Sequence, residues 1–484
     1  MRKILGVMLA ILCSIYGLFG FTSCQKKTKP HTRYEITCEY VPETRTLTGT
    51  AKVTFENPTD TALEVLKFQL YPNAYRKNAL YSPISSSYIE EAFYEGESYG
   101  EMTISSVRGS KNWEVMGEDE NVLYAYLERP LYPDESVVLD VGFMTKLAKV
   151  KHSTGVTKNA VQLGNFFPIL CGIRDNAFVE TVYHGMGTPF LLDVAEYKVK
   201  LTLPKEFEVA SSGSLSQENT LESKKEYTMY LTNARNFALV LYENGQKNSV
   251  QSGNTELTYY SVSDPTPKET LAKIKESFDF LETQFGDYPY AQYTVAETEY
   301  CGEGASYPTL TFLPMKANEE ERITEIVTLT ARQWWGGTVG SDPLLNAWQD
   351  EGLSAYSALL FFERYEKYGF TREGMVNHAL KEYRSYFDIY GSVLGRTDTR
   401  MTRTLDSYIS EYEYLCLSRY KAMIMLDTLR KSVGEEGFMH SLRRYYKDQR
   451  FQVASVGDLV ASFEKSGLDV AGFFESFLEG KAII

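Results

Sequence analysis

The chain has 484 residues, which is long enough for two or three domains with sizeable hydrophobic cores. Its formal net charge of −14 at pH 7 argues against nucleic acid as a partner, because phosphate binding needs concentrated lysine and arginine. Tyrosine is frequent, with 36 residues against 26 phenylalanines. Such amphipathic rings suit β-sheet surfaces and binding clefts.

The N-terminus has the pattern of an export signal. Two basic residues precede an apolar run over residues 4–20, and the small residues of "FTSC" then lead to Cys24. This pattern resembles a bacterial lipobox, in which the cysteine is lipidated. We expect a signal peptide over 1–23 and a tether over 24–32, with the lipid on Cys24 anchoring the protein to the extracytoplasmic face of the cell membrane. A transmembrane anchor is the alternative, but about 17 apolar residues are marginal for a span.

The next part of the chain alternates apolar and polar side chains. "YEITCEYV" and "AEYKVKLTLP" are examples, and turn residues such as "PET" and "NPTD" separate the runs. A period of two is typical of strands with one buried face. The pattern predicts an all-β domain over residues 33–250.

The period then changes. "TPKETLAKIKESFDFLETQFG" has apolar residues at helical spacing between a Thr-Pro start and a Gly stop. Two short strand-like runs follow, and beyond residue 317 nearly everything is helical. Helices are expected over roughly 319–336, 345–368, 371–387, 410–433, 435–448, 455–466 and 469–479. The fold class predicted is α+β, with the all-β domain followed by a mixed and then helical domain over 255–484.

Three segments carry a resemblance to a known family: "YVPETRTLTGTAKVTFENPTD", "DVAEYKVKLTLPKEFEVASSG" and "RQWWGGTVGSDPLLNAWQDEGLSAY". In their order and spacing they resemble the gluzincin aminopeptidases, the membrane alanyl aminopeptidase family of metallopeptidases. The resemblance covers residues from about 33 to 480. It implies that the second domain is thermolysin-like, with a short helical end.

A gluzincin holds zinc with the two histidines of H-E-x-x-H on one helix and with a later glutamate, while the glutamate of the motif is the general base. The resemblance implies that Thr328 and Arg332 occupy the histidine positions and Leu329 that of the base, whereas Glu351 remains as the third ligand. We therefore expect no zinc cofactor, because a permanent cation repels the metal. We predict that the Arg332 guanidinium takes the place of zinc and contacts Glu351. The alternative for Arg332 is a solvated surface charge.

Two further functional positions of the family are substituted. "EGASYPTL" resembles the segment whose glutamate binds the substrate α-amino group, and this position holds Ser306. Glu303 is close in sequence but is a weak candidate to replace that glutamate. "SRYKAM" resembles the segment with the tyrosine that stabilises the oxyanion, and this position holds Arg419. Tyr420 is one residue further on and is expected to point away, because one residue rotates a helical side chain by about 100°.

These substitutions favour a pseudopeptidase. We expect a catalytically inactive, membrane-tethered lipoprotein that keeps the peptidase cleft and binds a peptide or a protein partner there. The alternative is an active aminopeptidase of the same family with a non-standard site, so the sequence leaves open whether the chain is an enzyme. The cleft residues predicted are Glu303, Ser306, Arg332, Glu351, Arg419 and Tyr420.

Overall fold

The computed structural model describes residues 30–316, 318–395, 397–482 and 484 of the chain. From His31 onward these residues form one compact unit. The expected signal peptide and the expected lipid site at Cys24 lie outside the described residues. Within the described ranges, no helix combines the length and the apolar composition that a membrane span requires.

A seven-stranded sheet dominates the first half of the described chain. Its strands lie in the order β15-β16-β13-β1-β2-β7-β4. Their bounds are β1 (Thr32–Val41), β2 (Thr46–Glu56), β4 (Glu101–Arg108), β7 (Ser136–Lys146), β13 (Ala195–Pro204), β15 (Ser214–Thr220) and β16 (Lys224–Ala234). In β1, Tyr34, Ile36 and Cys38 are buried, whereas the residues between them are exposed or half-buried. This alternation is the period-two pattern of the sequence, with the apolar side chains on one face.

Smaller sheets complete the β-rich half. One consists of β3 (Leu63–Gln69), β5 (Asn112–Met116), β6 (Val122–Leu131) and β10 (Ile169–Leu170), and another of β8 (Thr154–Val156), β9 (Val161–Leu163), β14 (Glu208–Ser211) and β17 (Leu239–Tyr242). A ribbon is formed by β11 (Ile173–Arg174) and β12 (Ala177–Phe178), and two short helical segments are η1 (Tyr71–Tyr75) and α2 (Ile89–Ala92). Aromatic rings fill the core of this half: Tyr34 stacks on Tyr197 with ring centroids 5.1 Å apart, and Phe167 meets Tyr34 edge-on at 5.6 Å.

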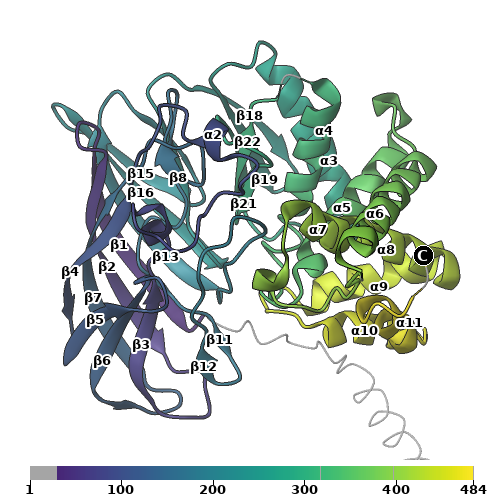
Figure 1. The fold of residues 1–484 in the computed structure, drawn as a ribbon. Helices are drawn as coiled ribbons and strands as arrows, with labels where there is room; N and C mark the ends of the chain where they lie inside the picture. The colour runs from purple at the N-terminus through teal and green to yellow at the C-terminus, as the bar shows by residue number, and fades with distance from the viewer. Residues whose placement is uncertain (1–29, 317, 396, 483) are drawn as a thin grey trace, which may run out of the picture. The chain divides into compact units, whose positions relative to one another are not determined.

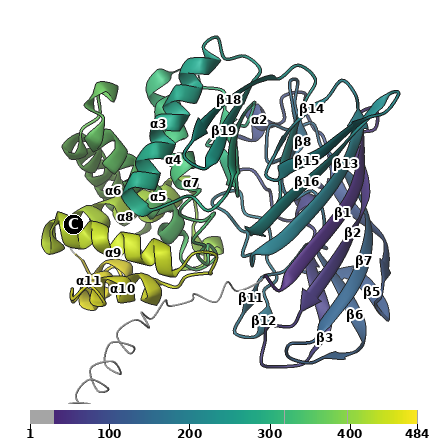
Figure 2. The same ribbon diagram turned by 180° about the vertical axis from the view of Figure 1, so that it is seen from behind.

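A five-stranded sheet opens the second half, and Figures 1 and 2 show it between the strands of the first half and the helices that follow. Its order is β18-β19-β20-β22-β21. The strands are β18 (Gln246–Ser252), β19 (Thr255–Ser261), β20 (Gln292–Thr298), β21 (Ala305–Tyr307) and β22 (Leu310–Pro314). The sheet begins at Gln246, within the range predicted for the β domain. Helix α3 (Pro267–Phe285) connects β19 to β20, which pair in parallel and therefore need such a crossover.

The rest of the described chain is helical, which confirms the predicted fold class. The helices are α4 (Glu319–Ala331), α5 (Ala347–Arg364), η2 (Glu366–Tyr368), α6 (Arg372–Leu394), η3 (Leu405–Ser407), α7 (Glu411–Leu415), a π-helical turn η4 (Cys416–Lys421), α8 (Ala422–Val433), α9 (Glu435–Asp448), α10 (Val456–Glu464) and α11 (Ala471–Leu478). One helix was predicted over 410–433, whereas the structure has three segments there, with the π-helical turn in the middle.

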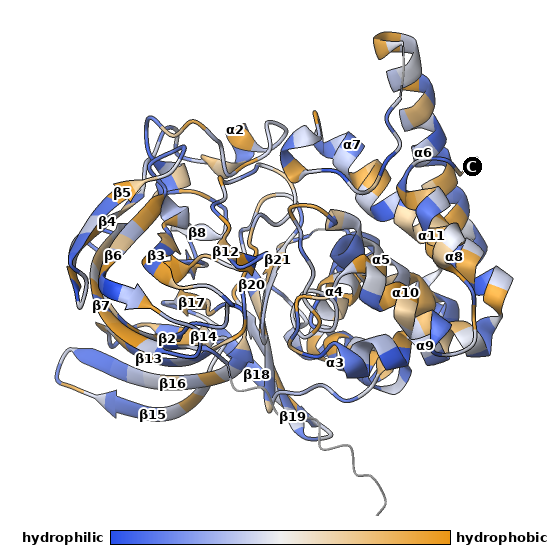
Figure 3. Ribbon diagram, turned by 90° about the horizontal axis from the view of Figure 1, so that it is seen from below, coloured by the Kyte–Doolittle hydropathy of each residue, from blue (hydrophilic) through white to orange (hydrophobic). Residues whose placement is uncertain are grey.

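The surface shows two contrasting places. Strands β15 and β16, at the edge of the large sheet, are largely hydrophilic, and Figure 3 shows this in blue. The C-terminal end of α6 instead carries exposed apolar residues, with Val393 exposed at 75% and Leu394 at 55%. The main apolar core of this half lies between α3, α4, α5, α8 and α9.

Candidate active-site cleft

Helix α4 carries the positions at which the family has its metal-binding motif. Asn318 begins the helix, because its side chain accepts hydrogen bonds from the amides of Glu320 and Glu321. Leu329 is buried in the hydrophobic core, and Thr328 is half-buried. The position of the general base therefore presents an aliphatic side chain that packs and cannot accept a proton.

The turn after α4 is fixed by its aromatic residues. The Trp334 indole is fully buried and donates a hydrogen bond of 3.0 Å to the carbonyl of Gly286. The Trp335 indole is also buried and donates at 2.8 Å to the Ser357 hydroxyl on α5. Gly336 has φ of +100°, a conformation that favours glycine. These contacts join the end of α4 to the end of α3 and to α5.

Arg332 caps the C-terminus of α4 and points to Glu351 on α5. Its Nη2 donates to both carboxylate oxygens of Glu351, each at 2.7 Å. The side chains are 17% and 8% exposed, so the pair is largely withdrawn from water. Burial alone would lower the pKa of Arg332, but Glu351, together with Glu303 and Tyr414, outweighs it, so that the pKa is raised. The structure thus has the contact that the sequence predicted, and Arg332 is not a solvated surface charge.

A second guanidinium reaches the same carboxylate. Arg419, on the π-helical turn, donates from Nη2 to Glu351 Oε2 at 2.9 Å and to Glu303 Oε2 at 2.6 Å. The four charges therefore alternate in the order Arg332, Glu351, Arg419, Glu303. Glu303 is paired with Arg419, so it is not available as a free carboxylate for a substrate amine. This agrees with the expectation that Glu303 is a weak candidate to replace the family's amine-binding glutamate.

Tyr420 lies away from this cluster. Its ring meets that of His378 on α6 edge-on at 5.5 Å, and it is not among the residues that line the cavity described below. This agrees with the expectation that Tyr420 points away, whereas its grouping with the cleft residues is wrong. The physical reason is the rotation between adjacent residues, which sends Arg419 to one side of the turn and Tyr420 to the other.

Glu325 joins the site without having been predicted. Its carboxylate accepts a hydrogen bond of 2.6 Å from the amide of Gly304. Burial, and then the nearby Glu303 carboxylate, raise the pKa of Glu325 to about 7. For Glu303, burial acts in the same direction, but the Arg419 guanidinium outweighs it and lowers the pKa to about 2. The two neighbouring carboxyl groups thus differ in protonation near neutral pH.

Ser306, at the family's amine-binding position, lies in β21. Its hydroxyl accepts a hydrogen bond of 2.7 Å from the Gln333 amide and donates to the carbonyl of Leu329 at 3.4 Å. The hydroxyl therefore has protein partners on both sides. Gly304 precedes this strand, and a Cβ there would lie 2.3 Å from the carbonyl oxygen of Phe312, so only glycine fits.

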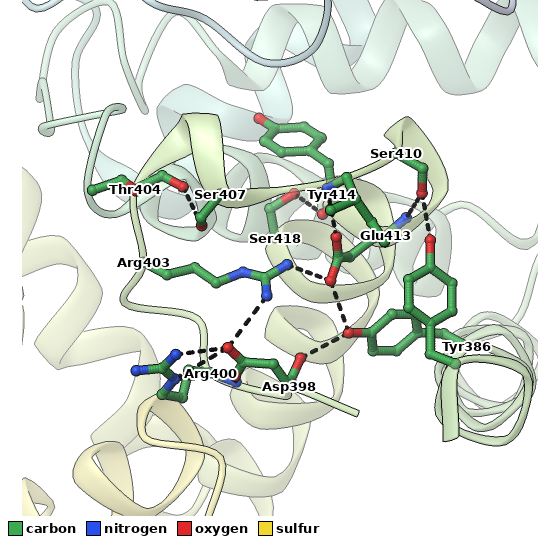
Figure 4. A network of polar contacts seen from close by, with 12 residues as sticks. Tyr386, Asp398, Arg400, Arg403, Thr404, Ser407, Ser410, Glu413, Tyr414 and Ser418 are labelled. Carbon is green, nitrogen blue, oxygen red and sulfur yellow. Dashed lines mark hydrogen bonds and ion pairs between the residues drawn. The ribbon is translucent and has the colours of Figure 1, made fainter. Parts of the chain in front are cut away.

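A polar network holds the π-helical turn in place (Figure 4). Arg403 Nη2 lies 2.6 Å from Glu413 Oε1, and the Tyr386 hydroxyl donates to the same carboxylate oxygen at 3.1 Å and to the carbonyl of Asp398 at 2.7 Å. Beside it, buried Lys421 donates to two backbone carbonyls, and burial lowers its pKa to about 8. These contacts fasten α7 and the turn to α6 and to the preceding loop, and so position Arg419.

A cavity of about 230 Å³ opens beside the charge cluster. Its wall combines residues of the β-rich half, within 83–88, 152–153, 183–192 and 235–236, with residues of the second half, within 300–308, 332–343, 350–351 and 411–415. Of the predicted cleft residues, Glu303, Ser306, Arg332 and Glu351 line it, whereas Arg419 and Tyr420 do not; Arg419 adjoins the site through its contacts with Glu303 and Glu351. The prediction omitted Tyr414 and Asp350, because neither matches a catalytic position of the family. Burial raises the pKa of Asp350 to about 6.

The residues at the family's metal position do not fit zinc. Glu351 is the only residue of a ligand type there, and Arg332 donates to both of its oxygens. Thr328 and Leu329 supply no imidazole or carboxylate, and a guanidinium repels a dication. Across residues 30–316, 318–395, 397–482 and 484, no three His, Cys, Asp or Glu side chains are grouped so that they could hold a metal ion.

Comparisons with known proteins agree with the fold. Residues 309–477 match the Peptidase family M1 domain. The M1 zinc metallopeptidase from Deinococcus radiodurans has a similar structure, with 18% sequence identity and a TM-score of 0.63 over 94% of this chain and 95% of that chain. A mutant of the same enzyme bound to a Tyr-Ser-Ala substrate is 17% identical, with a TM-score of 0.60 over 94% and 96% of the two chains.

A two-domain M1 zinc metallopeptidase mutant bound to L-arginine is 16% identical, with a TM-score of 0.62 over 94% of this chain and 95% of that chain. No curated protein sequence matches the chain. At these identities the solved structures establish the fold, and the family model matches the part of the chain from residue 309 to residue 477. The chain therefore has the two-domain fold of the M1 metallopeptidases, and its residues 309–477 match the Peptidase family M1 domain, which agrees with the resemblance to the gluzincin aminopeptidases.

Proposed function

We propose that this protein is a pseudopeptidase, which keeps the M1 cleft as a binding site and performs no zinc-dependent hydrolysis. The observation that carries the proposal is the contact of the Arg332 guanidinium with both oxygens of Glu351, at the place where the family has its metal. Zinc hydrolases need a metal to polarise the carbonyl and to supply hydroxide at neutral pH. With an arginine on the remaining ligand, neither role has a residue to support it.

The other functional positions support the same proposal. Leu329 is buried, so no general base faces the scissile bond. Arg419 stands at the oxyanion position but is held by Glu351 and Glu303. Losing the metal and the base together costs many orders of magnitude in rate, since enzymes of this kind accelerate hydrolysis by about 10⁶-fold or more. The ligand that we propose for the cleft is a peptide or an exposed segment of a protein partner.

For the place of action, we propose a lipoprotein tethered at the extracytoplasmic face of the cell membrane. The support is the apolar run followed by "FTSC" and Cys24. Substitution of Cys24 by alanine should move the protein from the membrane fraction to the soluble fraction. A variant that stays with the membrane would instead favour a transmembrane anchor.

Activity and metal restoration test the proposed function. The purified protein, supplied with zinc, should release no product from a panel of chromogenic aminoacyl substrates. The variant T328H/L329E/R332H should bind zinc, because it restores the motif beside Glu351. It should remain far less active than an intact family member, because Ser306 and Arg419 are unchanged. Metal-dependent turnover by the unmodified protein would overturn the proposal and favour an active peptidase with a non-standard site.

A further inference from the structure

The alternating charges of the cluster end in a cation at the cavity. Arg419 lies between Glu351 and Glu303, and Glu351 lies between two guanidinium groups. Arg332 is the terminal member and has Glu351 as its partner on one side. Within the described part of the chain, Nη2 is the only guanidinium nitrogen of Arg332 that makes a hydrogen bond. Its Nε and Nη1 donors are therefore available in a wall of the cavity.

Tyr414 supplies a second donor at the same wall. The residue is 4% exposed and lines the cavity, and its hydroxyl has no hydrogen-bond partner among the described residues. Figure 4 shows its ring directed away from the network of Arg403 and Glu413. Burial and then the Glu351 carboxylate hold the pKa of Tyr414 well above its ordinary value, so the hydroxyl keeps its proton. Because Tyr414 lines the cavity, its hydroxyl is a donor that a ligand acceptor could pair with.

Apolar side chains form another part of the wall. Ile84, Met186, Phe190 and Leu192 line the cavity beside the donors. A volume of about 230 Å³ lies below the usual range for drug-sized ligands, so the cavity suits a body about as large as one capped amino acid.

We propose that this cavity recognises a carboxylate with an apolar body, through the free donors of Arg332 and the hydroxyl of Tyr414. Arginine pairs with carboxylates through charge-assisted hydrogen bonds, which are the stronger class. The site would thus have exchanged recognition of a substrate amine for recognition of an acid. The inference rests on the proposed function in one respect, because it requires a cleft without zinc.

Glu411 also lines the cavity and accepts a hydrogen bond from the Ser85 hydroxyl, but the group that opposes this assignment most directly is Asp350. It lines the same cavity, and Glu351 and Arg332 are among the charges that act on it, together with Arg235. An ionised Asp350 would instead favour a cationic ligand. Burial raises its pKa to about 6, so its charge weakens in mildly acidic solution, whereas the charge of Arg332 persists. The experiment therefore compares an acid with an amine that has the same apolar body.

The probes are N-acetyl-L-phenylalanine, which has a free carboxylate, and L-phenylalaninamide, which has a free amine. Isothermal titration calorimetry with the full chain should show binding of the acid and at least tenfold weaker binding of the amide. The peptide N-acetyl-Gly-Gly-Phe distinguishes the source of the carboxylate. Equal or tighter binding of this peptide identifies a polypeptide C-terminus, whereas loss of binding identifies a small organic acid; both results support recognition of an acid.

Three variants locate the donors. R332K keeps a cation beside Glu351 but loses the lateral donors, and should weaken binding of the acid about tenfold or more. Y414F keeps the ring and should weaken it about fivefold. Y408F is the matched control, because the buried Tyr408 ring packs edge-on against Tyr414 at 5.4 Å but does not line the cavity, and it should change nothing. Thermal unfolding of each variant verifies that it is folded.

Several results would overturn the inference. They are preferred binding of the amide, binding of neither probe at millimolar concentration, or affinity for the acid that is equal in the wild type and in folded Y414F and R332K. Zinc content and hydrolysis, measured on the same preparation, report separately on the proposed function. A zinc-bound, hydrolytic protein would contradict that function, whereas a zinc-free protein that prefers the amide would contradict only the inference.

Discussion

Trp334 and Trp335 are held by packing and by indole hydrogen bonds, whereas Arg332, on the same turn, is held by charge. The tryptophans contact the end of α3 and α5 whatever occupies the metal position, so these side chains are needed for packing. Arg332 is held instead by its ion pair with Glu351. Without Arg332, this carboxylate would have Arg419 as its single cationic partner. Scaffold and chemistry are therefore separable in this segment, because residues 328–337 have the packing contacts of the tryptophans without the family's metal ligands.

Removing the aromatic anchor should have the largest effect. W334A deletes a fully buried indole that packs against Phe278 with centroids 5.4 Å apart, and it should lower the free energy of unfolding by about 3–5 kcal/mol. Urea unfolding followed by circular dichroism measures this. T328A is the control, because it changes the position that the resemblance assigns to the first histidine ligand on the same helix. It should lower the free energy of unfolding by about 1 kcal/mol or less. Equal losses from the two variants would contradict the separation of scaffold from chemistry.

Removing the central carboxylate should have the next largest effect. E351Q removes the charge between Arg332 and Arg419, so that Glu303 remains as the countercharge of Arg419 alone, and it should cost about 1.5–3 kcal/mol in the free energy of unfolding. E475Q is the control, because it breaks the exposed pair of Glu475 with Lys481 and should have a much smaller effect. If E351Q were as mild as E475Q, the charge cluster would contribute no stability.

Glu325 should make stability fall as the pH rises. A glutamate titrates near 4.5 in the unfolded chain, while burial and Glu303 raise the folded pKa to about 7. Between these values the folded protein holds more protons than the unfolded chain, so the free energy of unfolding decreases as the pH rises through this window. E325Q should remove a decrease of about 1–2 kcal/mol. Urea unfolding at pH 5 and pH 8 measures it, and identical differences in wild type and variant would refute the assignment.

The smallest effect is expected at Tyr420. Y420F removes a hydroxyl that lies outside the cavity, and should change the free energy of unfolding by about 0.5 kcal/mol or less. It should also leave the binding of N-acetyl-L-phenylalanine unchanged, in contrast to Y414F. A loss of binding in Y420F would show that the π-helical turn presents this residue, and not Tyr414, to the ligand.

Much of the fold could be predicted because its signals are local. The helical period, with a glycine before Glu435 and a serine before Val456, places α9 and α10 within a few residues of the structure. The contact of Arg332 with Glu351 could be predicted because the family motif fixes how α4 packs on α5. In both cases the pattern lies within one element or between two elements whose packing is known.

The rest of the site depends on contacts between distant segments. Glu303 and Arg419 meet because a loop after β20 approaches the π-helical turn, and no periodicity encodes that approach. The turn itself interrupts a segment that reads as one continuous helix from 410 to 433. Tyr414 and Glu325 carry no motif, so their places at the cavity and beside Gly304 emerge only from the fold. In the structure burial and neighbouring charged groups act on both residues, and this distinguishes them.

Elemental analysis tests the central claim most directly. The full chain is purified, incubated with excess zinc, exchanged into buffer with a mild chelator, and measured for zinc per chain beside T328H/L329E/R332H. If the Arg332 guanidinium holds the place of the metal, the unmodified protein should retain far less than one zinc per chain, and the restored variant should approach one. One chelator-resistant zinc per chain in the unmodified protein would contradict the account.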